Sequence, residues 1–426
     1  MADGPTPMTA IEHLLRDLAP QVLAVLARRH GDFADAEDAV QEALIAAAEQ
    51  WAASGVPANP SGWLYHVATR RYTDRLRSEI ARQQREHDTA VLWAENAFIP
   101  PPDVEVVPTT DDTLTLLLMC CHPVLTTASA AALTLRAVGG LTTTEIARAY
   151  LVPSATMGQR ISRAKHAIRQ SRVPFAMPTL SDLPRALVST MQALYLLFNE
   201  GHTASSGDAL LRIDLSAEAI RLTRLLHALV PSHGEVAGLL ALMLLTHARR
   251  DARTGPHGEL IPLDEQDRTR WNRTDIAEGI RLVEQALTSD AAGPYGIQAA
   301  IAALHAEAPD TATTDWAQIL ALYTVLEHMT GNPMVSLNRT IAVAMVDGPH
   351  AALSLLDTVA QNAQLADHHR VDAVRAHFHD MMGNHERAAH HYRLAAERTT
   401  SLPERHHLIA KAQRARHRVD AAQPME

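Results

Sequence analysis

The sequence has 426 residues, which is too long for one ordinary hydrophobic core and predicts two to three domains of roughly 150 residues each. Apolar residues make up 47% and charged residues 20%, so the chain can bury sizeable cores, and global disorder is excluded. The formal net charge of −10, taken as an average, argues against a nucleic-acid-binding protein.

The two cysteines, Cys120 and Cys121, are adjacent. This excludes a disulfide scaffold and any zinc site built on Cys-x-x-Cys pairs. No apolar run reaches the roughly 18 residues of a membrane span, and the first residues lack the basic start and apolar stretch of a signal peptide. The sequence therefore predicts a cytoplasmic protein with no membrane association.

The charge is distributed unevenly along the N-terminal part. Residues 32–49 carry six acids and no base. Residues 62–85 carry six arginines against two acids, a net of +4, and residues 136–172 carry seven bases against one acid, a net of +6. An acidic segment is thus followed by two basic segments, which the overall charge conceals.

Helical periodicity is pervasive and strand alternation is nearly absent, so the predicted fold class is all-α. In the acidic segment, apolar residues recur at helical spacing and form one stripe: Ala36, Ala39, Val40, Ala43, Leu44 and Ala47. Opposite this stripe, Asp35, Asp38, Glu42 and Glu49 share one exposed side, with Glu37 and Gln41 flanking it. This side is either a solvated face or a surface that docks on a partner protein.

The first basic segment is predicted to be a helix from Gly62 to about Arg85, capped by Ser61 after a turn-rich loop over 51–60. Trp63 is expected to anchor the core, and Leu64, Val67, Ala68 and Leu76 are expected to face inward. The exposed side then carries Arg70, Arg71, Arg75 and Arg77.

Residues 99–112, with four prolines and four acids, read as an extended linker between two domains. A helix-turn-helix follows at 141–166. Thr142 and Glu145 fit a capping box, Pro153 ends the first helix, and Ser154 is expected to cap the second. Met157, Ile161 and Ala164 form the buried stripe of that second helix.

The outward face of the second helix is basic, as in a recognition helix that enters the major groove of DNA. Its arginines can reach guanine bidentately, and Gln159 can reach adenine. The alternative is an ordinary hairpin with a solvated basic face. The residues predicted to contact DNA are Ser154, Thr156, Gln159, Arg160, Arg163 and Lys165.

The remainder, about 180–420, is predicted to be a series of helical hairpins. Gly383, Ala388, Tyr392 and Ala395 match the second half of a tetratricopeptide (TPR) repeat. No strict 34-residue period runs through the region, so a non-repeating helical bundle is the alternative.

Taken in order, these segments resemble a bacterial RNA polymerase sigma factor of the extracytoplasmic-function type. Residues 34–51 resemble the core-binding helix of region 2, 60–79 the helix that meets the −10 element, and 140–169 the region 4 that reads the −35 element. Further segments resemble the subgroup with a long TPR-like extension: 111–125, 195–207, 264–273, 293–306 and 315–323.

The resemblance implies four parts: region 2 at 8–98, the linker at 99–112, region 4 at 113–174, and a regulatory extension at 180–420. Its implied partners are promoter DNA and core RNA polymerase, through the β′ clamp helices and the β subunit. Asp35, Asp38, Gln41 and Glu42 would meet the polymerase. The residues that would meet the −10 element are Asn59, Arg70, Arg71, Arg75 and Arg77, although Arg70 departs from the family's usual asparagine.

Three further groups of polar residues are candidates for ligand or metal binding. Asn199, Glu200 and His202 form a polar node that either docks the extension, binds a small molecule, or caps a helix end. A salt-bridged hairpin corner is predicted at Asp264, Glu265, Asp267, Arg268 and Trp271. The 24 histidines show no metal-binding spacing, so no metal or cofactor is expected, and Cys121 is predicted to be a core residue.

No group presents a nucleophile with its base or a phosphate loop, so the chain is not expected to be an enzyme. The predicted function is a sigma factor whose C-terminal helices, with a small-molecule or protein ligand, regulate or enable activity. The alternative is a stand-alone helix-turn-helix regulator with a TPR-like sensor or interaction domain.

Overall fold

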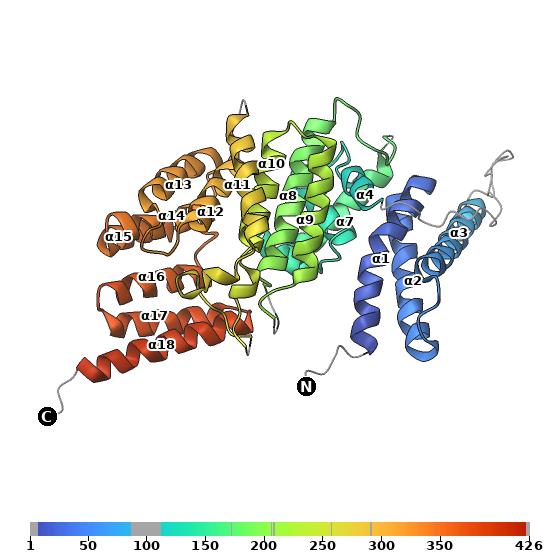
Figure 1. Ribbon diagram of the computed structural model, residues 1–426. Helices are drawn as coiled ribbons and strands as arrows, with labels where there is room; N and C mark the ends of the chain where they lie inside the picture. The colour runs from blue at the N-terminus through green and yellow to red at the C-terminus, as the bar shows by residue number, and fades with distance from the viewer. Residues whose placement is uncertain are drawn as a thin grey trace. The chain divides into compact units, whose positions relative to one another are not determined.

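The computed structural model describes residues 7–86, 112–171, 173–205, 207, 209–256, 258–289 and 292–422. These residues form eighteen α-helices and three short 3-10 helices, and they contain no β-strand, which confirms the all-α class (Figure 1). The chain divides into two compact units, Met1–Ala193 and Leu194–Glu426, with the boundary inside α8 (Leu183–His202). The predicted linker 99–112 lies outside the described residues except for Asp112.

The first unit begins with three helices, α1 (Pro7–His30), α2 (Phe33–Ser54) and α3 (Pro60–Glu86), of which α2 packs against both neighbours. The alanine stripe of α2 is buried as predicted, apart from Leu44, which is half-buried. Asp32 caps α2 by accepting a hydrogen bond from the Asp35 amide at 3.0 Å. The Trp51 and Trp63 rings meet edge to face, with centroids 5.5 Å apart, and link the end of α2 to the start of α3.

Two predictions for α3 were wrong. Asn59, rather than Ser61, caps the helix, because its Oδ1 accepts a hydrogen bond from the Gly62 amide at 2.9 Å. Leu76 does not face inward: it is 39% exposed. The inward face of this stretch is made instead by Leu64, Tyr65, Ala68 and Tyr72, which are buried, whereas Val67 is half-buried.

The second half of the unit contains α4 (Thr113–Cys120), α5 (Thr127–Ala137), α6 (Thr143–Ala149) and α7 (Ser154–Gln170). The predicted capping box of α6 is present, with the Thr142 amide donating to Glu145 at 2.6 Å. The predicted cap of α7 was wrong: Ser154 is the first helical residue and makes no capping bond. The predicted stripe of Met157, Ile161 and Ala164 is buried.

Cys120 and Cys121 are both free and buried, as predicted for Cys121. The Cys121 thiol lies 3.3 Å from the Thr190 hydroxyl. Burial raises the pKa of Cys121 to about 11, so its thiol is protonated at neutral pH.

The second unit continues α8 with α9 (Ile213–Leu229), α10 (Gly234–His247), η1 (Arg250–Ala252), η2 (Leu263–Glu265) and η3 (Arg268–Arg270). Then come α11 (Arg273–Thr288), α12 (Pro294–Glu307) and α13 (Trp316–Thr330). Helix α10 is apolar on most sides because it packs against α9, α11 and α12. Gly238 permits the approach to α12, since a Cβ there would lie 2.6 Å from the Gly296 amide nitrogen.

The chain ends with α14 (Pro333–Val346), α15 (Pro349–Val359), α16 (His369–Met381), α17 (His385–Arg398) and α18 (Leu402–Ala422). Helices α16 and α17 form a hairpin through Gly383, whose φ of +76° favours glycine. Ala388, Tyr392 and Ala395 are buried in one cluster with residues of α18. Whether these hairpins make a TPR-like array stays a prediction.

A search of the described helices for a segment long and apolar enough to cross a bilayer finds none.

Candidate functional site

The helix-turn-helix presents most of its predicted DNA-contacting residues to solvent. Ser154, Thr156, Gln159 and Arg163 are exposed along α7, whose opposite side is buried. The turn between α6 and α7 contains Leu151 at φ 52°, a left-handed conformation that a non-glycine residue rarely adopts. The helix pair therefore has the shape and the surface of a DNA-reading element.

Arg160 is positioned differently from the other residues of this face. It is half-buried, and its guanidinium carbon lies 5.5 Å from the centroid of the Tyr150 ring, at the end of α6. Burial raises the pKa of Tyr150 to about 12, so the ring stays neutral and attracts the cation through its π face. This contact orients Arg160 before any DNA is bound.

Lys165 and Arg169, on the other side of α7, contact acids of α2. The Lys165 ammonium lies 2.5 Å from the Glu37 carboxylate, whose side chain is only 5% exposed. Arg169 lies 2.5 Å from Asp35 and 3.7 Å from Asp32. The Phe33 and Phe175 rings, 5.0 Å apart, add an apolar contact beside these pairs. Helix α7 thus covers part of the acidic side of α2.

The other acids of this side are engaged by α3. Arg75 donates to Asp38 at 2.7 Å and to Glu42 at 2.6 Å, and Arg71 lies 3.6 Å from Glu42. All of these side chains are about 40–50% exposed, so the ion pairs are solvated and individually weak. Gln41 is exposed between them.

Two further arginines of α3 face solvent. Arg70 and Arg77 are exposed, and Arg77 lies 3.8 Å from Asp74 of its own helix. Asn59 is exposed as well, although its side-chain oxygen is occupied in capping α3. Of the predicted −10 residues, Arg70 and Arg77 therefore remain the most available, while Arg75 braces α2 against α3.

Glu37 is the residue that sequence analysis missed. It was set aside as a flanking acid, yet it is buried and pairs with Lys165, which was predicted to contact DNA. A signal was present: Glu37, Val40 and Leu44 stand at i, i+3 and i+7, so the acid lies on an apolar face. A carboxylate in such a place requires a cationic partner from another element.

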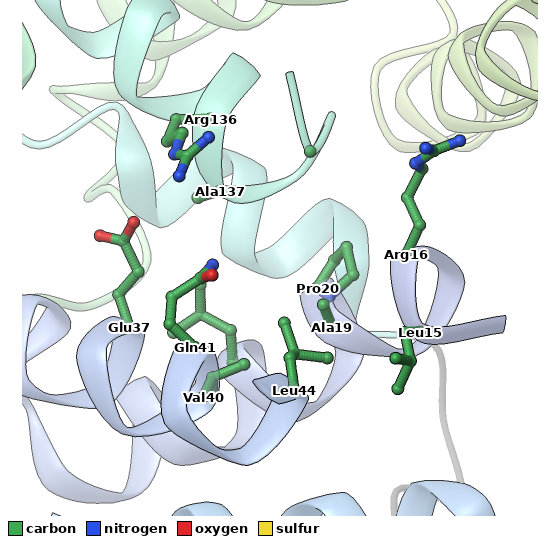
Figure 2. A pocket seen from close by; sticks show the side chains of 12 residues that line it. Leu15, Arg16, Ala19, Pro20, Glu37, Val40, Gln41, Leu44, Arg136 and Ala137 are labelled. Atoms are coloured by element: carbon green, nitrogen blue, oxygen red, sulfur yellow. The ribbon is translucent and has the colours of Figure 1, made fainter. Parts of the chain in front are cut away.

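Beside this contact lies a pocket of about 200 Å³, lined by α1, α2, α5 and the turn after α5 (Figure 2). Glu37 and Gln41 reach into it from α2 and face Arg136 of α5. Arg136 also donates to the Leu141 carbonyl at 3.1 Å and so fixes the turn that precedes α6. The pocket marks where the two helical groups of the first unit meet.

In the second unit, the three residues of the predicted polar node have separate roles. Glu200 is buried and accepts hydrogen bonds from the Ser205 amide and hydroxyl at 3.1 and 3.3 Å. His202 stacks on Phe198, and burial, followed by Arg253, lowers its pKa well below the usual value. The Asn199 backbone carbonyl accepts from the Thr203 amide at 2.8 Å. Together they end α8 and shape the following turn.

Three of the histidines of 368–391 are partners of acids. His391 contacts Asp372 at 3.1 Å, His385 contacts Asp380 at 2.8 Å, and His369 contacts Glu404 at 3.2 Å. In the parts of the chain that the structure describes, no three His, Cys, Asp or Glu side chains are grouped so as to hold a metal ion.

Comparison with known proteins places three family models along the chain. Sigma-70 region 2 matches residues 14–82, and Sigma-70 region 4 matches residues 115–168. A family of unknown function (DUF6596) matches residues 186–287. The chain is also 39% identical over 359 residues to the uncharacterized protein R00370 of Rhizobium meliloti (strain 1021), covering 82% of this chain and 83% of that protein. No solved structure matches the chain.

Proposed function

Because this chain belongs to the sigma-70 family, with both region 2 and region 4, we propose that it is a promoter-specificity subunit of RNA polymerase of the extracytoplasmic-function type. The observation that carries the proposal is the combination on one chain of an acidic α2, an arginine-rich α3 and a helix-turn-helix with a basic exposed face. The reaction belongs to the polymerase, and this chain contributes binding and melting of DNA in the cytoplasm.

In this proposal the acidic side of α2 binds the β′ clamp helices. Asp35, Asp38, Gln41 and Glu42 lie on one side of the helix, opposite the buried alanines. The three acids of this set now pair with arginines of this same chain. These ion pairs are solvated, so arginines of the polymerase can replace them at little cost. Complementary charge also speeds encounter with a basic surface.

Region 4 reads the −35 element with α7. Gln159 and Arg163 are exposed in the helix whose opposite face is buried, and Arg160 is oriented by Tyr150. Arginine pairs bidentately with guanine and glutamine with adenine. Ser154 and Thr156, at the helix N-terminus, are placed for phosphate oxygens. In region 2, Arg70, Arg71 and Arg77 of α3 would meet the −10 element, together with Asn59.

In the described structure α7 is packed against α2, and we call this arrangement closed. Arg169 pairs with Asp35 of the proposed polymerase surface, and Lys165 pairs with Glu37 beside it. In this proposal α7 therefore leaves α2 before the polymerase and the −35 element are bound together. Release exposes Glu37 to water and frees Lys165 for a phosphate. Opening is therefore an activation step of the proposed function.

The helices beyond residue 180 are proposed to regulate or enable this activity, either through a small-molecule or a protein ligand. The support is that most of this extension, Leu194–Glu426, is a separately compact unit with its own core. Its TPR-like character belongs to the proposal as well.

The test is in vitro transcription with purified full-length protein and core polymerase, on promoters selected from fragments that the protein enriches. Promoter-specific transcripts and a stable polymerase complex are expected. Duplex binding by the protein alone, with no polymerase complex, would instead establish the alternative of a stand-alone helix-turn-helix regulator. A chain ending after residue 180, assayed in parallel, tests the extension: unchanged activity would remove the regulatory role.

A further inference from the structure

Three arginines in the second unit lie near one another without a carboxylate partner. Arg249 and Arg253 flank η1, and Arg268 begins η3. Within the described residues, no carboxylate oxygen lies within 4.0 Å of their guanidinium nitrogens. Buried or half-buried cations in proteins are normally paired, because removal from water is costly without an opposite charge. This group departs from that rule.

The pKa values of these arginines reflect the same situation. Burial, followed by the neighbouring Arg268, lowers the pKa of Arg249 to about 10. Burial, followed by Arg249, lowers the pKa of Arg253 to about 9. Arg249 and Arg253 therefore remain charged at neutral pH, so they repel each other in a partly desolvated place.

The Trp271 ring is in contact with two of these cations. The guanidinium carbons of Arg268 and Arg249 are 4.7 and 5.9 Å from the centroid of its ring. The indole is only 3% exposed, and its Nε1–H is buried without a hydrogen-bond acceptor. Cation–π attraction holds the arginines against the ring but leaves the indole donor unsatisfied.

The arginines also keep unused donors. Arg268 donates through Nη1 to the His305 and Ala308 carbonyls, both at 2.6 Å, while its buried Nη2 has no acceptor. Arg253 is different, because its two terminal nitrogens donate to the His202 carbonyl and the Thr203 hydroxyl. The Arg249 guanidinium makes no hydrogen bond within the described residues, although the Arg249 backbone carbonyl accepts from the Ala252 amide at 3.0 Å. Free donors therefore gather at Arg249, Arg268 and Trp271.

Neighbouring groups do not supply the missing acceptor. Glu404 acts on Arg253 at longer range, but it is held by His369 at 3.2 Å and by Thr399 at 2.9 Å. Asp310 acts on Arg268, but it is exposed and accepts from the Thr313 amide at 2.8 Å. Burial, followed by Arg249, lowers the pKa of His305 to about 4, so this ring is neutral.

We infer that Arg249, Arg268 and Trp271 form a binding site for the oxyanion group, carboxylate or phosphate, of a small molecule. A guanidinium presents paired N–H donors that match two oxygens of such a group, and the indole N–H supplies a further donor. The bound anion separates the two like charges and satisfies the buried donors. The inference goes beyond the proposed function, since binding at this site requires neither polymerase nor promoter.

The test uses full-length protein labelled with ¹⁵N at its tryptophan indoles. The chain has five tryptophans, and Trp271→Phe assigns the Trp271 indole signal by its loss. Inorganic phosphate and acetate are titrated separately, with sodium chloride holding the ionic strength constant. A saturable shift of the Trp271 signal is expected. Saturation by phosphate identifies a phosphate group, and saturation by acetate alone identifies a carboxylate.

Arg249→Gln should weaken this binding at least about tenfold, because it removes the charge and one donor pair. Arg416→Gln, at an exposed position of α18, is the matched control and should bind as the wild type does. If Arg249→Gln does not fold, Arg249→Lys keeps the charge, loses the planar fork and should also bind more weakly.

Melting temperature gives a second measurement. Phosphate stabilises many proteins without binding a site, and that effect would persist in Arg249→Gln. A bound ligand instead stabilises the wild type and the Arg416→Gln control but not Arg249→Gln. The inference is overturned if neither anion shifts the Trp271 signal at about 10 mM, or if Arg249→Gln responds as the wild type does.

Discussion

The buried side chain of Glu37 determines how α7 packs on α2. It is 5% exposed, and the Lys165 ammonium of α7 reaches its carboxylate at 2.5 Å. A buried carboxylate that loses its partner is strongly unfavourable, so the pair makes the position of α7 depend on α2. Water can replace Lys165 only when α7 moves away.

We predict that Lys165→Met releases α7 from α2, because an unpaired buried carboxylate costs about 3–5 kcal/mol and Glu37 can regain hydration by undocking. Hydrogen exchange of the α2 amides should become faster, without global unfolding. The double variant Glu37→Gln, Lys165→Met is the control and should restore slow exchange. Wild-type protection in the single variant would show that the pair does not hold the helices together.

At Cys121, burial raises the pKa to about 11, and Cys120 is buried with it. At about pH 8 the thiolate fraction of Cys121 is then about one in a thousand, so alkylation should be about a hundredfold or more slower than for a free thiol. Iodoacetamide labelling followed by mass spectrometry, with a urea-unfolded sample as the reference, measures this. Rapid labelling of the folded protein would place these thiols at an accessible surface.

At the scale of single helices, different sides of α7 make different contacts. Its apolar stripe packs into the first unit, Lys165 and Arg169 reach α2, and Gln159 and Arg163 remain exposed. Helical geometry separates these sets because positions four apart share a side and positions two apart do not. A substitution on the exposed side of α7 can therefore be tested without disturbing its buried stripe or its contacts with α2.

Arg163→Ala should weaken specific promoter binding by about 1–3 kcal/mol, which is about five- to 150-fold, and should relax sequence preference at one position of the −35 element. The melting temperature should stay unchanged, because Arg163 is exposed. Binding of holoenzyme to wild-type and mutated −35 fragments measures the effect. Ser162→Ala, next to it on α7, is the control, and an equal loss there would point to a general effect on the helix.

His305, near the end of α12, should make the stability of the protein depend on pH. Burial and two arginines lower its pKa to about 4 in the folded state, against about 6.5 in an unfolded chain. Between these values the unfolded state binds more protons, so stability is full above about pH 6.5 and is lost as the pH falls toward 4.

Consequently, the fall in melting temperature between about pH 7.5 and pH 5 should be smaller in His305→Gln than in the wild type. His406→Gln, at an exposed position, should keep the wild-type fall. Identical pH profiles for all three proteins would mean that His305 is protonated as easily in the folded chain as in the unfolded one.

At the scale of the whole molecule, the first unit combines strong and weak contacts between its two helical groups. One buried ion pair and the contact of Phe33 with Phe175 hold α7 against α2, while the surrounding ion pairs of Asp35 and Asp32 are exposed and screened by salt. Such a closed arrangement is stable alone, yet it can yield to a partner that buries a larger surface.

Charge reversal of Asp38 and Glu42 to lysine should weaken binding to core polymerase, because both acids lie on the proposed docking side of α2. Helix content should be unchanged, since both side chains are substantially solvated. Co-purification with core polymerase and circular dichroism measure the two properties. Glu49→Lys, at an exposed position of the same helix, should bind normally; undiminished binding by the double variant would exclude this side of α2 as the docking surface.

Local chemistry was predictable wherever neighbours in the sequence decide it. The all-α class, the alanine stripe of α2, the Thr142–Glu145 capping box and the buried stripe of α7 followed from spacing and capping rules. The errors at Ser61, Leu76 and Ser154 lie at helix starts or at positions where small shifts of the helix decide which side is buried.

Long-range pairing was not predictable from periodicity. The sequence by itself determined the order of acidic and basic helices and the helix-turn-helix, because helical spacing and capping act over a few residues. Only the tertiary structure decided that Lys165 pairs with Glu37 in the closed arrangement, and that Arg249 and Arg268 meet at Trp271 with no carboxylate partner among the described residues. The physical reason is that charge pairing depends on distance in space. Glu37 and Lys165 are far apart in the sequence, and even the closer Arg249, Arg268 and Trp271 become neighbours only when the chain folds.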